Sequence, residues 1–142
     1  MSQTVPETCD VICCATVTAA TENVRRHLLA LAKAPLGLRG DFSVIYHLTA
    51  DNPAVLPAGL AMHDRGPLSG PAYLAAAAKA RIIVDLEDGA DAATRIARLT
   101  ALKQAGAQIL AENGPAARDV LPADALFSTP EALLDKVYAR LR

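Results

Sequence analysis

Polar residues that could bind a ligand follow the apolar, strand-like segments of this chain. Asp85 and Glu87 are carboxylates that can bind a cation or a ribose hydroxyl and would repel a diphosphate, whereas His63 and Arg65 can face a phosphate. A solvated loop without a ligand is the alternative interpretation for each position. The ligand-binding candidates chosen on this ground are Thr16, Thr18, His63, Arg65, Asp85, Glu87, Glu112 and Asn113.

The turn after the first strand-like segment excludes three familiar sites. It reads Ala15-Thr16-Val17-Thr18-Ala19-Ala20 and has no glycine, so neither a dinucleotide fingerprint nor a P-loop is present there. It also has no carboxylate, so the acidic metal pocket of a phosphoacceptor receiver domain is missing. A Gly-x-Ser-x-Gly nucleophile elbow does not occur either. We therefore predict no cofactor, no metal ligand and no assigned catalytic residue.

The segments that must position the candidates alternate between strand and helix patterns. Such alternation is typical of parallel strands joined by right-handed crossovers. We predict a doubly wound, mostly parallel sheet of five to six strands with helices on both faces, a Rossmann-like three-layer α/β fold. Ligands of such sheets bind beyond the carboxyl ends of the strands. The predicted strands are Asp10–Thr18, Phe42–Leu48, the weaker Ala58–His63, Arg81–Leu86, Gln108–Ala111 and Ala125–Phe127; the predicted helices begin near Thr21 and Pro130 and cover Ala72–Ala80, Ala92–Ala105 and Ala116–Val120.

Apolar spacing predicts which helix residues face the sheet. In the helix after Asp91, Ile96, Leu99 and Leu102 fall on the inner side, and His27 is expected on the surface of the first helix.

The last helix has two alternative start signals. Either Ser128 and Glu131 form a capping box, or Thr129 is the N-cap with Pro130 at the first helical position.

The three cysteines, Cys9, Cys13 and Cys14, lie within six residues of one another. An odd, local cluster makes a disulfide framework improbable. Strand alternation places Cys13 and Cys14 on opposite faces of the sheet, which favours buried small side chains over a metal or redox site.

The composition indicates a folded domain without a charged target. Residues 1–8 are polar and read as a flexible arm, and residues 9–142 as one domain of the 142-residue chain. Hydrophobic residues make up 52%, and much of that fraction is small because alanine alone supplies 30 residues. Fourteen basic and fifteen acidic residues leave no positive excess for nucleic acid. No signal peptide and no apolar run near the roughly 20 residues of a membrane span is present, so we expect a cytoplasmic protein.

Short motifs along residues 9–142 resemble the C-terminal, donor-binding domain of GT-B glycosyltransferases, most closely those of bacterial surface-polysaccharide biosynthesis. The resemblance implies a Rossmann-like fold, a nucleotide-sugar ligand, and Arg98 as the arginine of the helix after the central strand. Arg98 thereby becomes a further ligand-binding candidate. The motifs that carry the resemblance are Pro67-Leu68, Tyr73-Leu74, the strand Ala80–Leu86, Arg98, the turn Ala105-Gly106, the strand Ile109–Asn113, the strand Leu126-Phe127 and the helix from Pro130.

The chain departs from this family at positions that matter for catalysis. The family has a donor-contacting glutamate five residues before the glycine that ends the helix, and Ala101 stands there. The glycine-rich turn after the first strand and the N-terminal acceptor domain have no counterpart. We expect a stand-alone glycosyltransferase-like domain without independent catalysis, which binds a nucleotide-like ligand, a protein partner or a second copy. The alternatives are the donor-binding half of a two-chain glycosyltransferase and a receiver-like scaffolding module without a phosphoacceptor.

Overall fold

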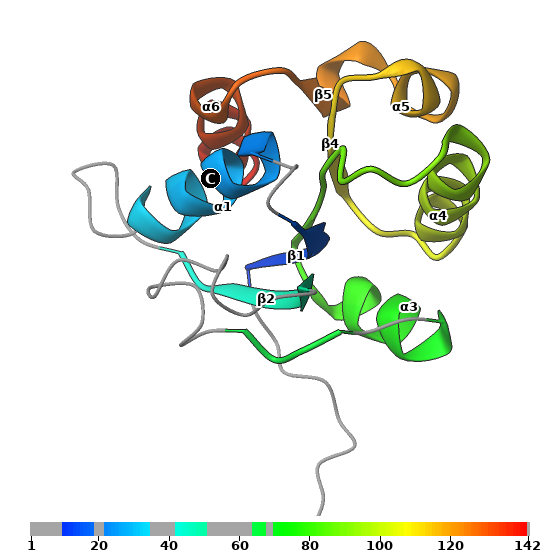
Figure 1. The fold of residues 1–142 in the computed structure, drawn as a ribbon, viewed down its shortest axis with the longest axis horizontal. Helices are drawn as coiled ribbons and strands as arrows, with labels where there is room; N and C mark the ends of the chain where they lie inside the picture. The colour runs from blue at the N-terminus through cyan, green and yellow to red at the C-terminus, as the bar shows by residue number, and fades with distance from the viewer. Residues whose placement is uncertain (1–9, 19–21, 35–41, 51–63, 68–69, 142) are drawn as a thin grey trace, which may run out of the picture.

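The apolar segments form a five-stranded sheet in which every neighbouring pair of strands is parallel (Figure 1). The computed structural model describes residues 10–18, 22–34, 42–50, 64–67 and 70–141. The strand order is β2-β1-β3-β4-β5, and the doubly wound, Rossmann-like prediction is confirmed. The strands are β1 (Val11–Val17), β2 (Val44–Ala50), β3 (Ile82–Asp85), β4 (Ile109–Glu112) and β5 (Leu126–Phe127); the helices are α1 (Glu22–Lys33), α3 (Gly70–Lys79), α4 (Ala92–Gln104), α5 (Pro115–Val120), α6 (Pro130–Leu141) and the short 3-10 turn η3 (Ala123–Ala125).

Asp64 marks a further position at the outer edge of the sheet. Tyr46 of β2 pairs with Cys13 of β1 on one side and forms an isolated parallel bridge to Asp64 on the other. The Arg65 N–H donates to the Tyr46 carbonyl at 2.7 Å. The five strands follow the order 2-1-3-4-5, which is the flavodoxin-like variant of the doubly wound sheet, and the single Asp64 bridge lies beyond β2. The predicted strand Ala58–His63 itself lies outside the described residues.

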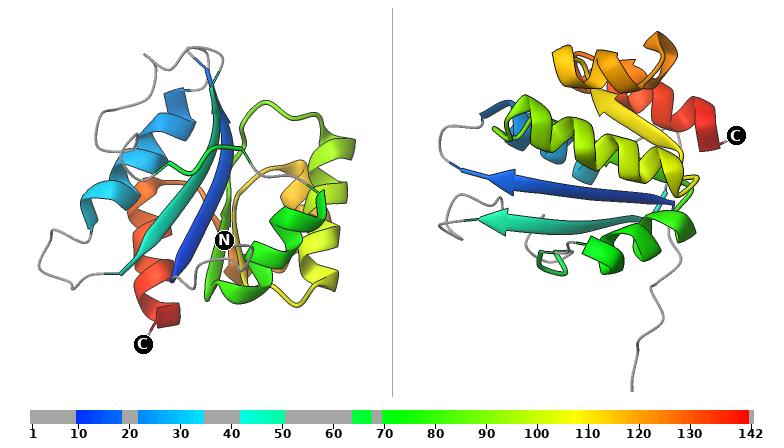
Figure 2. Two further views of the ribbon diagram at one scale, coloured as in Figure 1. Left: turned by 90° about the horizontal axis from the view of Figure 1, so that it is seen from below. Right: turned by 90° about the vertical axis from the view of Figure 1, so that its right-hand side faces the viewer.

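Helices cover both faces of the sheet (Figure 2), and an apolar layer lies beneath them on each face. Alternate residues of β1 point to opposite faces, so Cys13 joins the layer under α1 and α6, while Ile12 and Cys14 join the layer under α3, α4 and α5. This confirms the opposite placement of the two cysteines. Each fully buried Leu, Ile or Val side chain contributes about 1.5–3 kcal/mol, so both layers hold the helices firmly on the sheet.

Two predictions about helix faces are wrong. Ile96 is only partly buried, because the inner stripe of α4 is made by Arg95, Leu99 and Leu102. His27 is buried rather than exposed, since its ring packs 5.3 Å from the ring of Phe127. The Asn23 carbonyl accepts the His27 Nδ1–H at 2.7 Å, which satisfies one ring nitrogen in this apolar setting.

Side-chain caps begin the two helices that follow β3 and β5. Asp91 accepts the Thr94 N–H at 2.7 Å at the start of α4, and this bond lowers the pKa of the exposed Asp91 carboxyl. Thr129 Oγ1 accepts the Ala132 N–H at 3.1 Å at the start of α6. Of the two start signals predicted for that helix, the structure therefore has the Thr129 cap with Pro130 as the first helical residue.

Burial should make Cys13 and Cys14 unreactive in the folded protein. Both are free thiols, and burial raises the pKa of Cys14 to about 12 and that of Cys13 well above its ordinary value. Because only the thiolate is nucleophilic, a Cys9→Ser variant should not react with a thiol reagent at pH 8 until urea unfolds it. Reaction of Cys14 in the native state should begin only as the pH approaches its raised pKa. Rapid labelling of folded Cys9→Ser protein at pH 8 would contradict this expectation.

Candidate functional site

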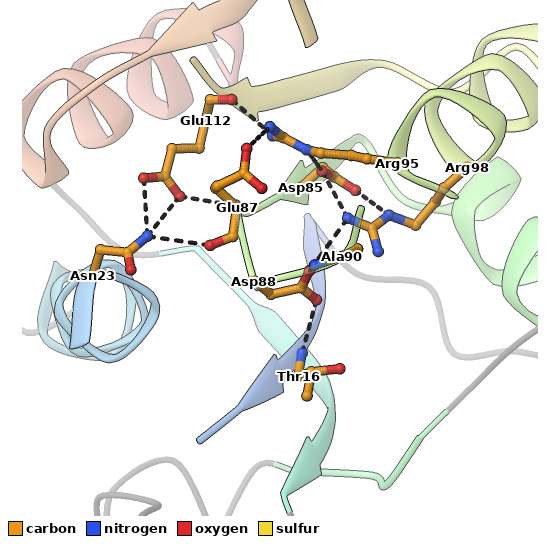
Figure 3. A network of polar contacts seen from close by, with 9 residues as sticks. All are labelled: Thr16, Asn23, Asp85, Glu87, Asp88, Ala90, Arg95, Arg98 and Glu112. Atoms are coloured by element: carbon orange, nitrogen blue, oxygen red, sulfur yellow. Dashed lines mark hydrogen bonds and ion pairs between the residues drawn. The ribbon is translucent and has the colours of Figure 1, made fainter. Parts of the chain in front are cut away.

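Charged and polar side chains from five elements and loops meet at the carboxyl edge of the sheet (Figure 3). They come from the end of β1, the start of α1, the end of β3 with the loop after it, α4, and the end of β4. Figure 3 draws them as one connected set of hydrogen bonds and ion pairs, here called the edge network. Its members are Thr16, Asn23, Asp85, Glu87, Asp88, Ala90, Arg95, Arg98 and Glu112.

Asp85 is the buried centre of the edge network. It ends β3, is 0% exposed, and accepts hydrogen bonds from Arg95 Nε at 2.9 Å and Arg98 Nε at 2.7 Å. Arg95 and Arg98 lie three residues apart on α4, so both side chains can reach the same carboxylate. Burial alone lowers the pKa of Arg98, but the charge of Asp85 and the hydrogen bond to it raise this pKa above its ordinary value. The guanidinium therefore stays charged and compensates the buried carboxylate.

Arg95 is almost completely buried, at 1% exposure, and connects three elements. Besides Asp85, its Nη1 donates to Glu87 Oε2 at 2.8 Å and its Nη2 donates to the Glu112 backbone carbonyl at 2.7 Å. One planar guanidinium thus binds the end of β3, the loop after it and the end of β4. All three guanidinium nitrogens of Arg95 donate to protein oxygens. This side chain therefore positions the strand ends and the loop around it rather than binding a substrate.

Glu112 and Asn23 connect the start of α1 to the same edge. The Glu112 Oε1 accepts the Glu87 backbone N–H at 2.8 Å. Asn23 Nδ2 lies 3.2 and 3.1 Å from the two Glu112 carboxylate oxygens and 3.3 Å from the Glu87 carbonyl oxygen. The first turn of α1 is therefore held against the ends of β3 and β4.

Asp88 connects the loop after β3 to β1. Its Oδ2 accepts the Thr16 backbone N–H at 2.9 Å, and its Oδ1 lies 3.8 Å from Arg98 Nη2. The Ala90 N–H points to the same carboxylate at 3.4 Å. Asp88 is only 8% exposed, so its charge depends on these donors for compensation.

Gly114 lies against the Glu87–Arg95 pair, and replacing it should disturb that pair. A Cβ at this position would lie 2.9 Å from Glu87 Oε2 and 3.2 Å from Arg95 Nη1. Because Arg95 is held by two other bonds, we expect Gly114→Ala to displace the Glu87 carboxylate and to cost about 1 kcal/mol of unfolding free energy. Urea denaturation of the wild type and of Gly114→Ala measures this difference in unfolding free energy.

The Glu87→Ala background provides the control for the Gly114 substitution. With the displaced carboxylate already removed, Gly114→Ala should have little further effect on stability. An equal cost in both backgrounds would mean that the Glu87 carboxylate is not what a side chain at position 114 disturbs.

The structure brings together only part of the predicted ligand-binding set. Asp85, Glu87, Arg98 and Glu112 belong to the edge network through their side chains, while Thr16 belongs to it through its backbone N–H. Their assembly at the carboxyl edge is what the predicted topology implied.

The remaining candidates lie elsewhere or outside the described residues. Thr18 follows β1 and is partly buried, and the exposed Arg65 lies beside β2 at the outer edge of the sheet. Asn113 is exposed and accepts a hydrogen bond from Arg118 Nη1 at 3.0 Å. His63 is not among the described residues.

Four members of the edge network were not chosen from the sequence: Asn23, Asp88, Arg95 and Ala90, the last of which takes part only through its backbone N–H. Arg95 does carry a sequence signal, because it lies four residues before Leu99 and seven before Leu102, on the apolar stripe of the helix. A charged residue at such a position needs a buried partner. Asn23 carries no comparable signal, since a polar residue at a helix start is ordinary.

Four carboxylates surround two guanidiniums at this edge, so the formal charges of Asp85, Glu87, Asp88 and Glu112 exceed those of the arginines. Among the described residues no group of three or more His, Cys, Asp or Glu side chains is arranged to hold a metal ion. No described helix is both long and apolar enough to cross a membrane.

Neither a protein-family model nor a curated protein nor a solved structure matches the chain. The fold and the edge network therefore define its class as a Rossmann-like α/β domain.

Proposed function

We propose that this chain is a glycosyltransferase-like binding domain that does not catalyse a reaction on its own. The observation that carries the proposal is the burial of the Asp85–Arg95 ion pair at the centre of the edge network. A general acid or base must reach the substrate and exchange a proton with it. Asp85 and Arg95 are instead buried against each other at 2.9 Å, so neither side chain reaches a substrate.

The exposed rim of the edge network is where we place the ligand. The Glu87 side chain is 39% exposed and that of Arg98 is 23% exposed, so both can contact a molecule beyond the carboxyl ends of the strands. The resemblance of the sequence motifs to donor-binding domains supports a nucleotide-like ligand. The exposed parts of the charged Glu87 and Arg98 side chains are equally open to a protein partner or a second copy of the chain. The free cysteines Cys13 and Cys14 support a cytoplasmic location.

Calorimetry with UDP-, GDP- and TDP-sugars tests whether the domain binds a nucleotide-like ligand. We expect measurable heat without release of free sugar, and loss of that heat in Arg98→Ala but not in Arg140→Ala, a matched change on α6. Release or transfer of the sugar would contradict the absence of catalysis. If no nucleotide sugar gives heat, both the nucleotide-like ligand and the two-chain glycosyltransferase alternative are ruled out. Sedimentation equilibrium then tests whether the chain binds a second copy of itself.

The receiver-like alternative has less support than the glycosyltransferase-like one. The strand order 2-1-3-4-5 is shared with receiver domains and does not separate the two alternatives. The end of β1, however, supplies alanine, threonine and valine where a receiver places carboxylates.

A further inference from the structure

β1 extends beyond β3 at the carboxyl edge of the sheet, so its last residues pair with β2 and not with β3. β1 pairs with β2 as far as Val17, but it pairs with β3 only as far as Cys14 opposite Asp85. The chain leaves β1 through α1 on one face and leaves β3 through α4 on the other. This divergence is the topological switch point, where doubly wound sheets bind their ligands.

A backbone donor of β1 points past the end of β3. The Val11 N–H donates to Ser43 on the β2 side, so alternation directs the Thr16 N–H to the opposite side, beyond the end of β3. No residue of β3 pairs with Thr16, and its N–H would lack a sheet partner. Arg98 of α4 donates to Asp85 through Nε at 2.7 Å and Nη2 at 3.1 Å, and its Nη2 also lies 3.8 Å from Asp88 Oδ1.

The Asp88 carboxylate lies between these two donors. The chain turns at Gly89, whose φ of 92° is a left-handed conformation that favours glycine, and this turn keeps Asp88 next to β1. Oδ2 accepts the Thr16 N–H at 2.9 Å. A backbone N–H and a guanidinium are the groups with which proteins bind phosphate and carboxylate ligands. Asp88 thus occupies the position that an anionic group of a ligand would take.

We propose that the Thr16 N–H and the Arg98 guanidinium form an anion subsite that Asp88 occupies as an internal competitor. A phosphate-bearing ligand enters only when the loop 86–90 moves Asp88 away, so the domain is held in a state of low anion affinity. The neighbouring carboxylates of Asp85 and Glu87 add to the selection against free anions. This inference rests on the proposed function for the assumption that the edge binds a ligand, and it adds how that binding is regulated.

Phosphate titrations of Asp88 variants test the inference. With inorganic phosphate and pyrophosphate as probes, Asp88→Ala should bind about tenfold more tightly than the wild type or better, because the competitor is gone. The Thr16 amide signal in nitrogen–proton correlation spectra should move with added phosphate in this variant and not in the wild type. Asp119→Ala removes one exposed carboxylate on α5 and is the control for the change in net charge, with no gain expected.

A second variant keeps the test decisive if Asp88→Ala does not fold. In Asp88→Asn the side-chain oxygen still accepts the Thr16 N–H while the negative charge is lost, so phosphate affinity should rise less than in the alanine variant but above the wild type. The inference is overturned if the folded variants show no phosphate-dependent shift of the Thr16 amide, or if Asp119→Ala gains as much. Nucleotide-sugar binding by the wild type is a separate measurement, so a failure here is distinguishable from a failure of the proposed function.

Discussion

Replacing Arg95 by alanine is expected to lower the free energy of unfolding by about 3–5 kcal/mol, the largest effect of any single change in the edge network. The guanidinium is 1% exposed and bonds Asp85, Glu87 and the Glu112 carbonyl. Its removal leaves the buried Asp85 carboxylate with Arg98 as its remaining ion-pair partner among the described residues. A buried charge that loses a partner in a medium of low polarity cannot recover the hydration it gave up on folding.

Urea denaturation of three arginine variants measures this effect. Arg95→Lys keeps the positive charge but cannot reproduce three bonds of a planar fork, so it should fall between the wild type and Arg95→Ala. Arg118→Ala is the matched control, because this exposed side chain bonds Asn113 at the surface, and its cost should stay within about 0.5 kcal/mol. A loss below about 1 kcal/mol for Arg95→Ala would show that the edge network does not support the fold.

Replacing Leu133 by alanine is expected to cost about 2–5 kcal/mol, the second large effect. Leu133 lies on α6, is 0% exposed, and belongs to the apolar layer between α1, α6 and the sheet. The Thr129 cap and the parallel strands on the other side hold the helix in place, so the space left by the side chain can close only partly. The remaining cavity adds to the lost transfer free energy of the removed carbons.

The neighbouring residue on the same helix is the control for Leu133. Leu134 is partly buried at the margin of the same layer, and Leu134→Ala should cost less than half as much in the same thermal or urea experiment. Equal costs at the two positions would contradict the placement of α6. A large loss for Leu133→Ala alone supports the view that the last helix is an integral part of the domain.

The sequence by itself determined the alternation of strands and helices, and from it the edge of the sheet where the site lies. Runs such as Val11–Val17 and Ile82–Asp85 are apolar without helical spacing, which identifies strands buried on both faces. Since parallel strands end at one edge, the polar residues after each run, Asp85 and Glu112 among them, could be named in advance as neighbours. These features are local, and local spacing is enough to read them.

Only the tertiary structure decided which charged groups bind one another. Arg95 and Arg98 lie on the same helix and are alike in type, yet one is buried with three partners and the other is at the rim. The difference depends on which side of α4 packs on the sheet: Arg95 lies on the buried side with Leu99 and Leu102, and Arg98 does not. That packing joins segments that are distant in the sequence. For the same reason the sequence did not single out Asp88. In the structure its carboxylate accepts the Thr16 N–H at the switch point. Which charged side chains form ion pairs depends on the geometry of segments far apart in the sequence. The spacing of residues along the chain therefore does not predict these pairs.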